Sequence, residues 1–176
     1  SYYKDEATKG QLLGLFKMTT TNLLNLYGYT KEEIEKLIGE ALLFDELLVP
    51  VTKSSVERAD YVKMYNPVLS AEIKDKVKNF DLVSLANNLV NAKIDKIIVT
   101  NLDFLNAFDT IINEDNFQIL KSWMTVSNLI SFASSLTDEI RIAGGAFSRA
   151  LSGVKEPQSQ EKFAFYQAYN PFSQVV

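Results

Sequence analysis

The sequence predicts an all-α protein, a multi-helix bundle with long helices. Apolar residues recur at three- and four-residue spacing along most of the chain, as the buried face of a helix requires. β-branched residues gather in one short run, Lys96–Thr100, which we expect to be at most one extended segment. The chain has 176 residues, of which 47% are hydrophobic, so we expect residues 1–176 to form a single helical domain.

The first two helices are predicted on either side of Gly28. Leucines and aromatic residues from Leu12 to Tyr27 follow helical spacing before the glycine. Thr30 and Glu33 then have the spacing of a capping box, in which each side chain receives a hydrogen bond from the other residue's amide. This pattern predicts a second helix that begins after Thr30 and runs toward Pro50.

The middle of the chain is predicted as short helices separated by polar breaks. After the linker Thr52–Ser55, a helix through Arg58 should end near Tyr65-Asn66, because Pro67 disfavours helical geometry in the residue before it. Polar residues at helix starts then predict where the next helices begin. We expect these starts at Ser70, Asp81 and Asp103.

The longest helical pattern runs from about Asp115 to Leu151. Gly144-Gly145 interrupts this pattern, and Gly153 is predicted to end it in the left-handed conformation that glycine favours. A polar turn at Glu156–Gln160 leads to a last amphipathic segment. Its apolar residues are Phe163, Phe165, Tyr166 and Tyr169.

The chain contains neither histidine nor cysteine. This removes the most frequent general base, the usual zinc ligands and the thiolate nucleophile together. A Ser-His-Asp triad, a Cys-His pair or an H-E-x-x-H site cannot be built from these residues alone. We therefore expect no catalytic residue, no metal ligand and no cofactor-binding residue in this chain.

Four groups of residues are still worth testing as sites. Asp45-Glu46 is a tempting carboxylate pair, but neighbours on a helix point about 100° apart. Asp138-Glu139 beside Arg141 is interpreted as a surface charge group, and Gly144-Gly145 as a place of close helix packing or a kink. Trp123 is interpreted as a core residue.

Charge argues against several classes of partner. The net charge is −4, and the densest basic group, Lys74, Lys76 and Lys78, alternates with Asp75. We interpret this group as a solvated helix face and expect no nucleic-acid partner. We also expect no membrane span, because no apolar run approaches about 20 residues. Ser1 is interpreted as a cloning remnant.

The order of features along nearly the whole chain resembles the N-terminal helical region of the neprilysin-like zinc metallopeptidases, in particular the bacterial endopeptidase O branch. An Arg-x-Asp segment leads into Tyr-Asn, an acidic helix start, Phe-Asp, a valine-like pair, a Trp-bearing helix and a terminal Ala-Phe-x-x-Ala-Leu-x-Gly. The residues concerned are Arg58-Ala59-Asp60, Tyr65-Asn66, Ser70–Ile73, Phe80-Asp81, Ile98-Val99, Trp123, Ala146-Phe147, Ala150-Leu151 and Gly153.

This resemblance implies a fragment of a larger two-domain enzyme. In that family two domains enclose a cavity, and the zinc ligands lie on an H-E-x-x-H helix and a later Glu in the C-terminal part. The fragment would be an inactive helical cap that restricts the access of oligopeptides to the cavity. Zinc would then belong to the parent enzyme, and the C-terminal catalytic domain and peptide substrates would be its partners. For the bacterial protein that the resemblance implies, the lack of cysteine fits a reducing compartment, so we expect the cytoplasm and leave export open as the alternative.

Two other classes of function remain open at this point. A free-standing helical interaction module would dock a partner helix through an apolar stripe. A helical bundle that binds a small molecule would need convergent buried polar groups, which periodicity does not reveal.

Overall fold

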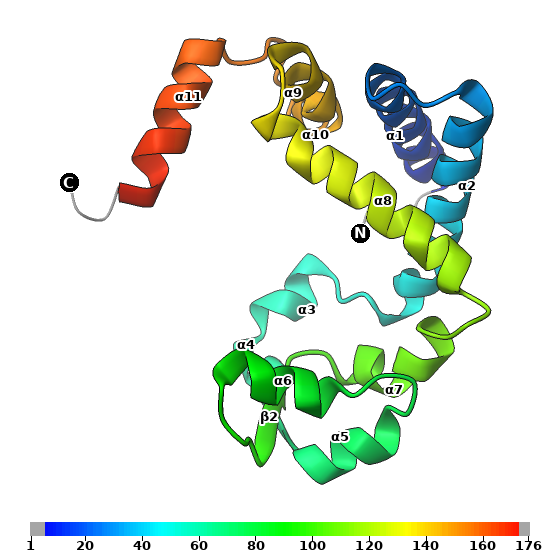
Figure 1. The fold of residues 1–176 in the computed structure, drawn as a ribbon, viewed down its shortest axis with the longest axis vertical. Coiled ribbons are helices and arrows are strands. Elements are labelled where there is room, and N and C mark those ends of the chain that lie inside the picture. Colours follow the sequence, from blue (N-terminus) through cyan, green and yellow to red (C-terminus); the bar gives the residue numbers. More distant parts are fainter. Residues whose placement is uncertain (1–5, 173–176) are drawn as a thin grey trace. The chain divides into compact units, whose positions relative to one another are not determined.

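The computed structural model describes residues 6–172, which fold mainly into α-helices (Figure 1). The predicted mainly-α class is therefore confirmed. The described chain divides into two compact units: a middle unit, residues 39–124, and a terminal unit, residues 6–38 and 125–172. The prediction that residues 1–176 act as one domain stays a prediction, and Ser1 lies outside the described residues.

The middle unit is built from short helices around a small sheet. Strands β1 (Asn66–Leu69) and β2 (Lys96–Val99) pair antiparallel, with Asn66 opposite Val99 and Leu69 opposite Lys96. The helices are the second half of α2 (Lys31–Leu48), η2 (Val49–Val51), α3 (Ser55–Ala59), α4 (Tyr61–Met64), α5 (Ser70–Lys76), α6 (Leu82–Val90), α7 (Leu102–Ile111) and the first half of α8 (Phe117–Phe132). The core is Val68, Ile73, Val77, Val83 and Leu105.

The expected extended run at Lys96–Thr100 is confirmed as β2, but its partner strand was not predicted. Pro67 favours extended geometry at Asn66, and the structure uses that geometry for a strand as well as a helix end. The side-chain amide of Asn66 donates to the carbonyl of Val99 at 2.9 Å. Strand β1 thus forms because of a partner strand, β2, that comes much later in the sequence.

The predicted helix end near Tyr65-Asn66 is confirmed, because α4 ends at Met64 with Tyr65 as its C-cap. The helix through Arg58 is not continuous, however: it is broken at Asp60, whose carboxylate accepts from the Lys63 amide and starts α4. Two predicted helix starts in the middle unit are wrong. Ser70 is the first residue of α5 instead of its N-cap, because its hydroxyl donates to the carbonyl of Ile94 at 2.7 Å. Asn101, and not Asp103, caps α7 by accepting from the Phe104 amide.

The cap predicted at Asp81 is confirmed. Its carboxylate accepts hydrogen bonds from the amide of Ser84 at 2.9 Å and from the Ser84 hydroxyl at 2.6 Å. Helix α6 therefore begins at Leu82, as the sequence predicts.

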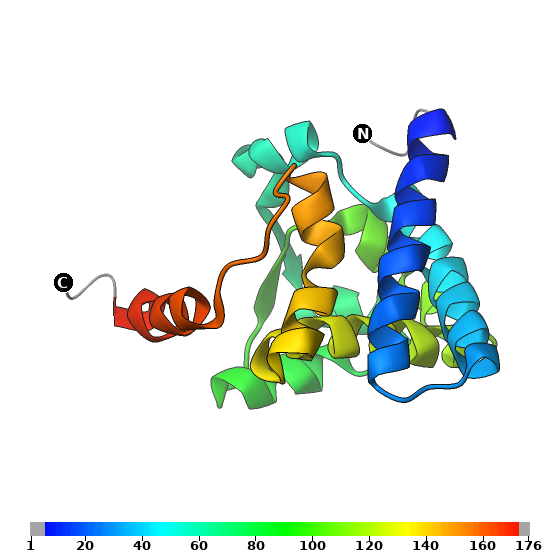
Figure 2. The ribbon, with the colours of Figure 1, turned by 90° about the horizontal axis from the view of Figure 1, so that it is seen from above.

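The terminal unit begins with a helical hairpin. Its elements are α1 (Glu6–Leu26), the first half of α2, the second half of α8, η3 (Ala133–Ser135), α9 (Asp138–Gly144), α10 (Ala146–Leu151), α11 (Gln160–Tyr169) and η4 (Asn170–Phe172). Gly28 lies in the turn between α1 and α2 and has a φ of 89°, a left-handed conformation that favours glycine. The predicted capping box of Thr30 and Glu33 is confirmed. Figure 2 shows α1 and the start of α2 running side by side in opposite directions.

The longest predicted helix is divided earlier than the sequence suggested. Helix α8 ends at Phe132, and Leu136 is extended before α9 begins at Asp138. Ser134, Ser135 and Thr137 favour turns and caps because their hydroxyls compete for backbone groups. The predicted break at Gly144-Gly145 is confirmed, and so is Gly153, whose φ is 68°.

Candidate functional site

The carboxylate pair Asp45-Glu46 lies in the part of α2 that belongs to the middle unit. Asp45 is half-buried and Glu46 is exposed, so the helix presents the two groups to different surroundings. Paired acid and base catalysis needs two carboxyl groups aimed at one reacting position. The pair therefore does not form such an arrangement.

The lysine group in α5 and just after it makes contacts within the middle unit. Lys76 donates to the side-chain oxygen of Asn106 at 2.8 Å. Lys78 donates to the carbonyl of Lys74 at 2.8 Å and lies 3.4 Å from the carboxylate of Asp75. These lysines form no continuous basic stripe of the kind that binds nucleic acid.

A buried polar contact in the middle unit was missed at the sequence level. The Glu40 carboxylate of α2 accepts from the hydroxyl of Ser122 at 2.6 Å and from the amide of Gln118 at 3.0 Å, both on α8. Ser122 is only 1% exposed, and nearby Phe44 packs on Trp123 with ring centroids 5.4 Å apart. The contact fixes α2 against α8, and Trp123 contributes to packing as predicted.

Arg141 makes several contacts within the terminal unit. Its guanidinium donates twice to the Asp138 carboxylate and once to the Gln158 carbonyl, at 2.9 Å, and lies 4.7 Å from the centre of the Phe163 ring. The Arg141 side chain is only 9% exposed, whereas the Asp138 side chain is 42% exposed. The surface charge group predicted here is thus a partly buried ion pair that links α9 to the loop before α11.

The two glycines between α9 and α10 allow close approach. A Cβ atom on Gly144 would lie 2.3 Å from the Cβ of Ala133, which is a severe clash. A Cβ atom on Gly145 would lie 2.6 Å from Nη1 of Arg149, the end of a flexible side chain. This geometry agrees with the packing interpretation of the pair, and neither glycine belongs to a phosphate-binding loop.

A surface hollow of about 510 Å³ lies in the terminal unit, beside these glycines. Two of its charged residues have partners: Asp138 binds Arg141, and Arg149 donates to the carbonyl of Ile142 at 2.6 Å. The lining residues are Asn22, Leu26, Asp138, Glu139, Ile142, Ala143, Ala146 and Arg149. The hollow holds no nucleophile with an adjacent base, so it offers no catalytic constellation.

The shifted carboxyl pKa values in the described chain arise from helix capping. Hydrogen bonds from Ser84 lower the pKa of Asp81, those from Thr30 lower the pKa of Glu33, and those from Lys63 lower the pKa of Asp60. Burial raises the pKa of Tyr27, whose hydroxyl donates to the Leu129 carbonyl at 2.8 Å. Each shift is explained by local structure and not by a reacting site.

The described residues do not fit a zinc ion. Within residues 6–172 there is no cluster of three or more Asp or Glu side chains able to hold a metal, and the sequence has no histidine or cysteine to add. None of the helices in residues 6–172 is long and apolar enough to cross a bilayer. The expectation that this chain holds no catalytic or metal-binding residue stays a prediction.

Comparison with known proteins identifies the relatives of this chain. The model of the N-terminal region of peptidase family M13 matches residues 1–176. A neutral endopeptidase of Lactococcus lactis subsp. cremoris is 38% identical over 177 residues, covering 100% of this chain and 28% of that protein. A neutral endopeptidase of Lactobacillus helveticus is 36% identical over 176 residues, covering 100% of this chain and 27% of that protein.

Solved structures share the fold. The crystal structure of PepO from Lactobacillus rhamnosis superposes with a TM-score of 0.86 at 22% identity, over 99% of this chain and 28% of that one. A zinc metalloprotease of Mycobacterium tuberculosis in its open state gives a TM-score of 0.81 at 23% identity, over 97% and 27%. The chain therefore spans less than a third of the length of the relatives that it matches.

Proposed function

Because this chain belongs to peptidase family M13, we propose that it is the non-catalytic helical cap of a zinc metalloendopeptidase that hydrolyses oligopeptides. One observation carries the proposal: the family match covers the whole chain, yet the chain has no histidine and its described residues offer no metal cluster. The zinc and its activated water would then be held by another part of the parent polypeptide. The catalytic domain and peptide substrates would be the partners of this region.

The proposed cap would limit access to the cavity by its shape and would supply no reacting group. Charged groups such as Asp138, which pairs with Arg141, and Asp81, which caps α6, are engaged in local contacts and are not poised for proton transfer. A wall of packed helices around a reacting centre excludes water and limits which substrates enter. We expect the parent to prefer short peptides over folded proteins for this reason. The related endopeptidases are bacterial. We propose a cytoplasmic parent because a chain without cysteine fits a reducing compartment, with export as the alternative.

Two measurements on separate samples test this function. After dialysis, the 176-residue chain should retain no stoichiometric zinc and should not cleave peptides. The full-length protein encoded by the gene should bind zinc and cleave oligopeptides, lose activity with a chelator, and regain it with zinc. Stoichiometric zinc in the 176-residue chain would contradict the assignment of the metal to another region. A gene that ends soon after residue 176 would favour the free-standing interaction module instead.

The walling role needs a test of its own. A series of peptides of increasing length should show kcat/KM falling steeply once the substrate exceeds the size that the cavity admits, while an unfolded protein such as denatured casein is cut slowly. Equal rates on short peptides and long unfolded chains would contradict a size-limiting wall, even if the enzyme proved to be a zinc peptidase.

A further inference from the structure

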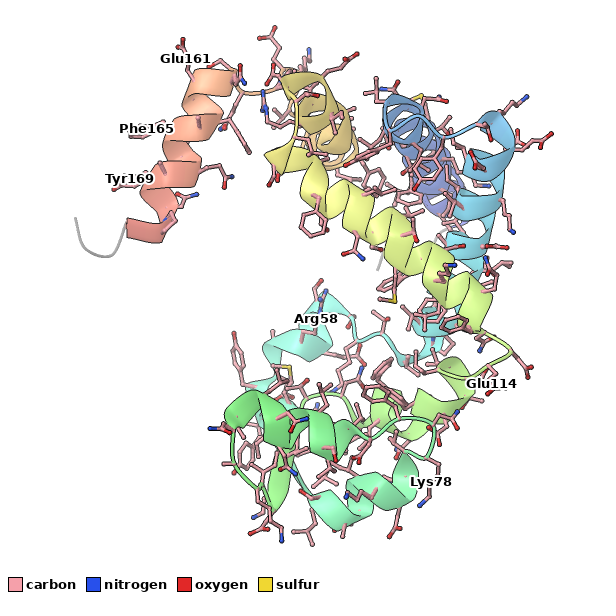
Figure 3. All side chains as sticks on the ribbon, in the orientation of Figure 1. Arg58, Lys78, Glu114, Glu161, Phe165 and Tyr169 are labelled. Atoms are coloured by element: carbon pink, nitrogen blue, oxygen red, sulfur yellow. The ribbon has the colours of Figure 1, made fainter. Side chains whose placement is uncertain are left out.

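Helix α11 carries an exposed aromatic face. Phe165 is 61% exposed, and Tyr166 and Tyr169 are each 40% exposed. The rings of Phe165 and Tyr169 stack with centroids 5.7 Å apart, and Tyr166 meets the Phe165 ring edge-on at 5.5 Å. Figure 3 shows Phe165 and Tyr169 extending to the same side of α11, away from α9 and α10. The three rings thus form a continuous apolar surface on one side of the helix.

The opposite side of α11 makes the contact with its own unit. Phe163, which is half-buried, lies under the guanidinium of Arg141, and Arg141 also holds the carbonyl of Gln158 just before the helix. Ser159 caps the helix by accepting from the Lys162 amide. Helix α11 has no buried residue despite its aromatic content.

The contacts of α11 within its own unit bury little of its apolar surface. A helix of ten residues is marginal in water on its own, because most helical stability in proteins comes from packing an apolar face. One capping serine and one cation–aromatic contact give only partial support. The face made by Phe165, Tyr166 and Tyr169 is therefore where further packing is to be expected.

We propose that the aromatic face of α11 docks against an apolar surface in the portion of the parent polypeptide outside this region. This inference rests on the proposed function, since it takes the parent to be a longer peptidase. The argument for this occupant is length: the chain covers 28% of the related endopeptidase from Lactococcus lactis, so most of that relative lies outside the matched region. Three adjacent rings suit a dry, aromatic-accepting surface of the kind found inside a single polypeptide.

Hydrogen exchange on two chain lengths tests the docking, and substitutions on α11 then show which face is responsible. In the full-length parent, the amides of α11 should exchange at least about tenfold more slowly than in the 176-residue chain. The double variant Phe165→Ala/Tyr169→Ala should remove that protection in the parent and leave exchange in the 176-residue chain unchanged. Gln167→Ala is the matched control, because Gln167 is exposed and lies on the other side of the helix, and it should change neither.

The possible outcomes separate this inference from the proposed function. Equal exchange of α11 in both chain lengths overturns the docking, whatever the enzymatic result. Protection already present in the 176-residue chain, together with a dimer in sedimentation, assigns the face to a second copy and also overturns it. Protection that appears only in the parent supports the docking, and it does so even if that parent binds no zinc and cleaves no peptide, in which case only the proposed function fails.

Discussion

Replacing Gly144 by alanine tests the closest helix approach in the terminal unit. The added Cβ would lie 2.3 Å from the Cβ of Ala133 and 3.6 Å from the carbonyl oxygen of Ile130. Carbon atoms in van der Waals contact normally stand about 3.5–4.0 Å apart. Ala133 is 1% exposed and its Cβ is fixed to the backbone, so no rotamer change relieves the clash. The backbone of α9 or η3 must move.

The expected loss of stability follows from two opposing contributions. Overpacking a tight interior site costs about 1–3 kcal/mol. Alanine is preferred over glycine in a helix by up to about 1 kcal/mol, although Gly144 is the last residue of α9 and gains only part of this. We therefore expect Gly144→Ala to lower the free energy of unfolding by about 1–2 kcal/mol.

Urea unfolding followed by far-ultraviolet circular dichroism measures this change, while the fluorescence of Trp123 reports on the middle unit. Gly145→Ala is the control, because its Cβ would meet the mobile end of Arg149. The Gly145 backbone is in the right-handed helical region, which alanine adopts without strain, and losing the Arg149 hydrogen bond to Ile142 costs about 1 kcal/mol at most. We therefore expect Gly145→Ala to cost less than Gly144→Ala. Ala133→Gly should suppress Gly144→Ala, so the two changes should not be additive. If Gly144→Ala unfolds at the same urea concentration as the original chain, the clash with Ala133 does not destabilise the fold and the prediction is wrong.

Three further changes test contacts elsewhere in the chain. Tyr27→Phe removes the hydrogen bond to the Leu129 carbonyl and should lower the free energy of unfolding by about 1 kcal/mol, whereas a null effect in urea unfolding would mean that water replaces the bond. Ser122→Ala leaves the Glu40 carboxylate with Gln118 and should cost about 1–2 kcal/mol, with exposed Ser131→Ala as the near-neutral control in thermal unfolding. The pKa of Asp81 is lowered in the folded chain, so its cap stabilises at pH values above about 4 and is lost as the pH falls through the lowered pKa. Asp81→Asn should therefore flatten the dependence of the unfolding midpoint on pH below about 4, and an unchanged slope would contradict the assignment.

The sequence predicted those features whose physical cause lies within a few residues. The capping box of Thr30 and Glu33, the cap at Asp81 and the left-handed Gly153 all depend on atoms that are close in the chain. Local hydrogen bonds of this kind can be read from residue type and spacing alone. The lack of a histidine-based or cysteine-based site was equally plain, because it depends only on composition.

The features that were missed depend on distant partners. Ser70 has the residue type of an N-cap, but its hydroxyl is engaged by Ile94 across the chain. Strand β1 exists because β2 pairs with it. Arg141 was interpreted as a surface charge, and only the fold reveals that Gln158 and Phe163 surround it. Periodicity predicts which face of a helix is apolar, but it does not predict which residues cover that face.

The proposed role of a wall that takes no part in the reaction agrees with the engagement of particular charged groups in caps and ion pairs. A carboxylate such as Asp81, whose pKa is lowered by cap hydrogen bonds, stays ionised at neutral pH and is a weak general acid or base there. An arginine such as Arg141, held by a carboxylate and a carbonyl, has few donors left for a substrate. Substitutions in such a wall should therefore change which peptides enter, and so KM across a length series, before they change kcat for the shortest peptide.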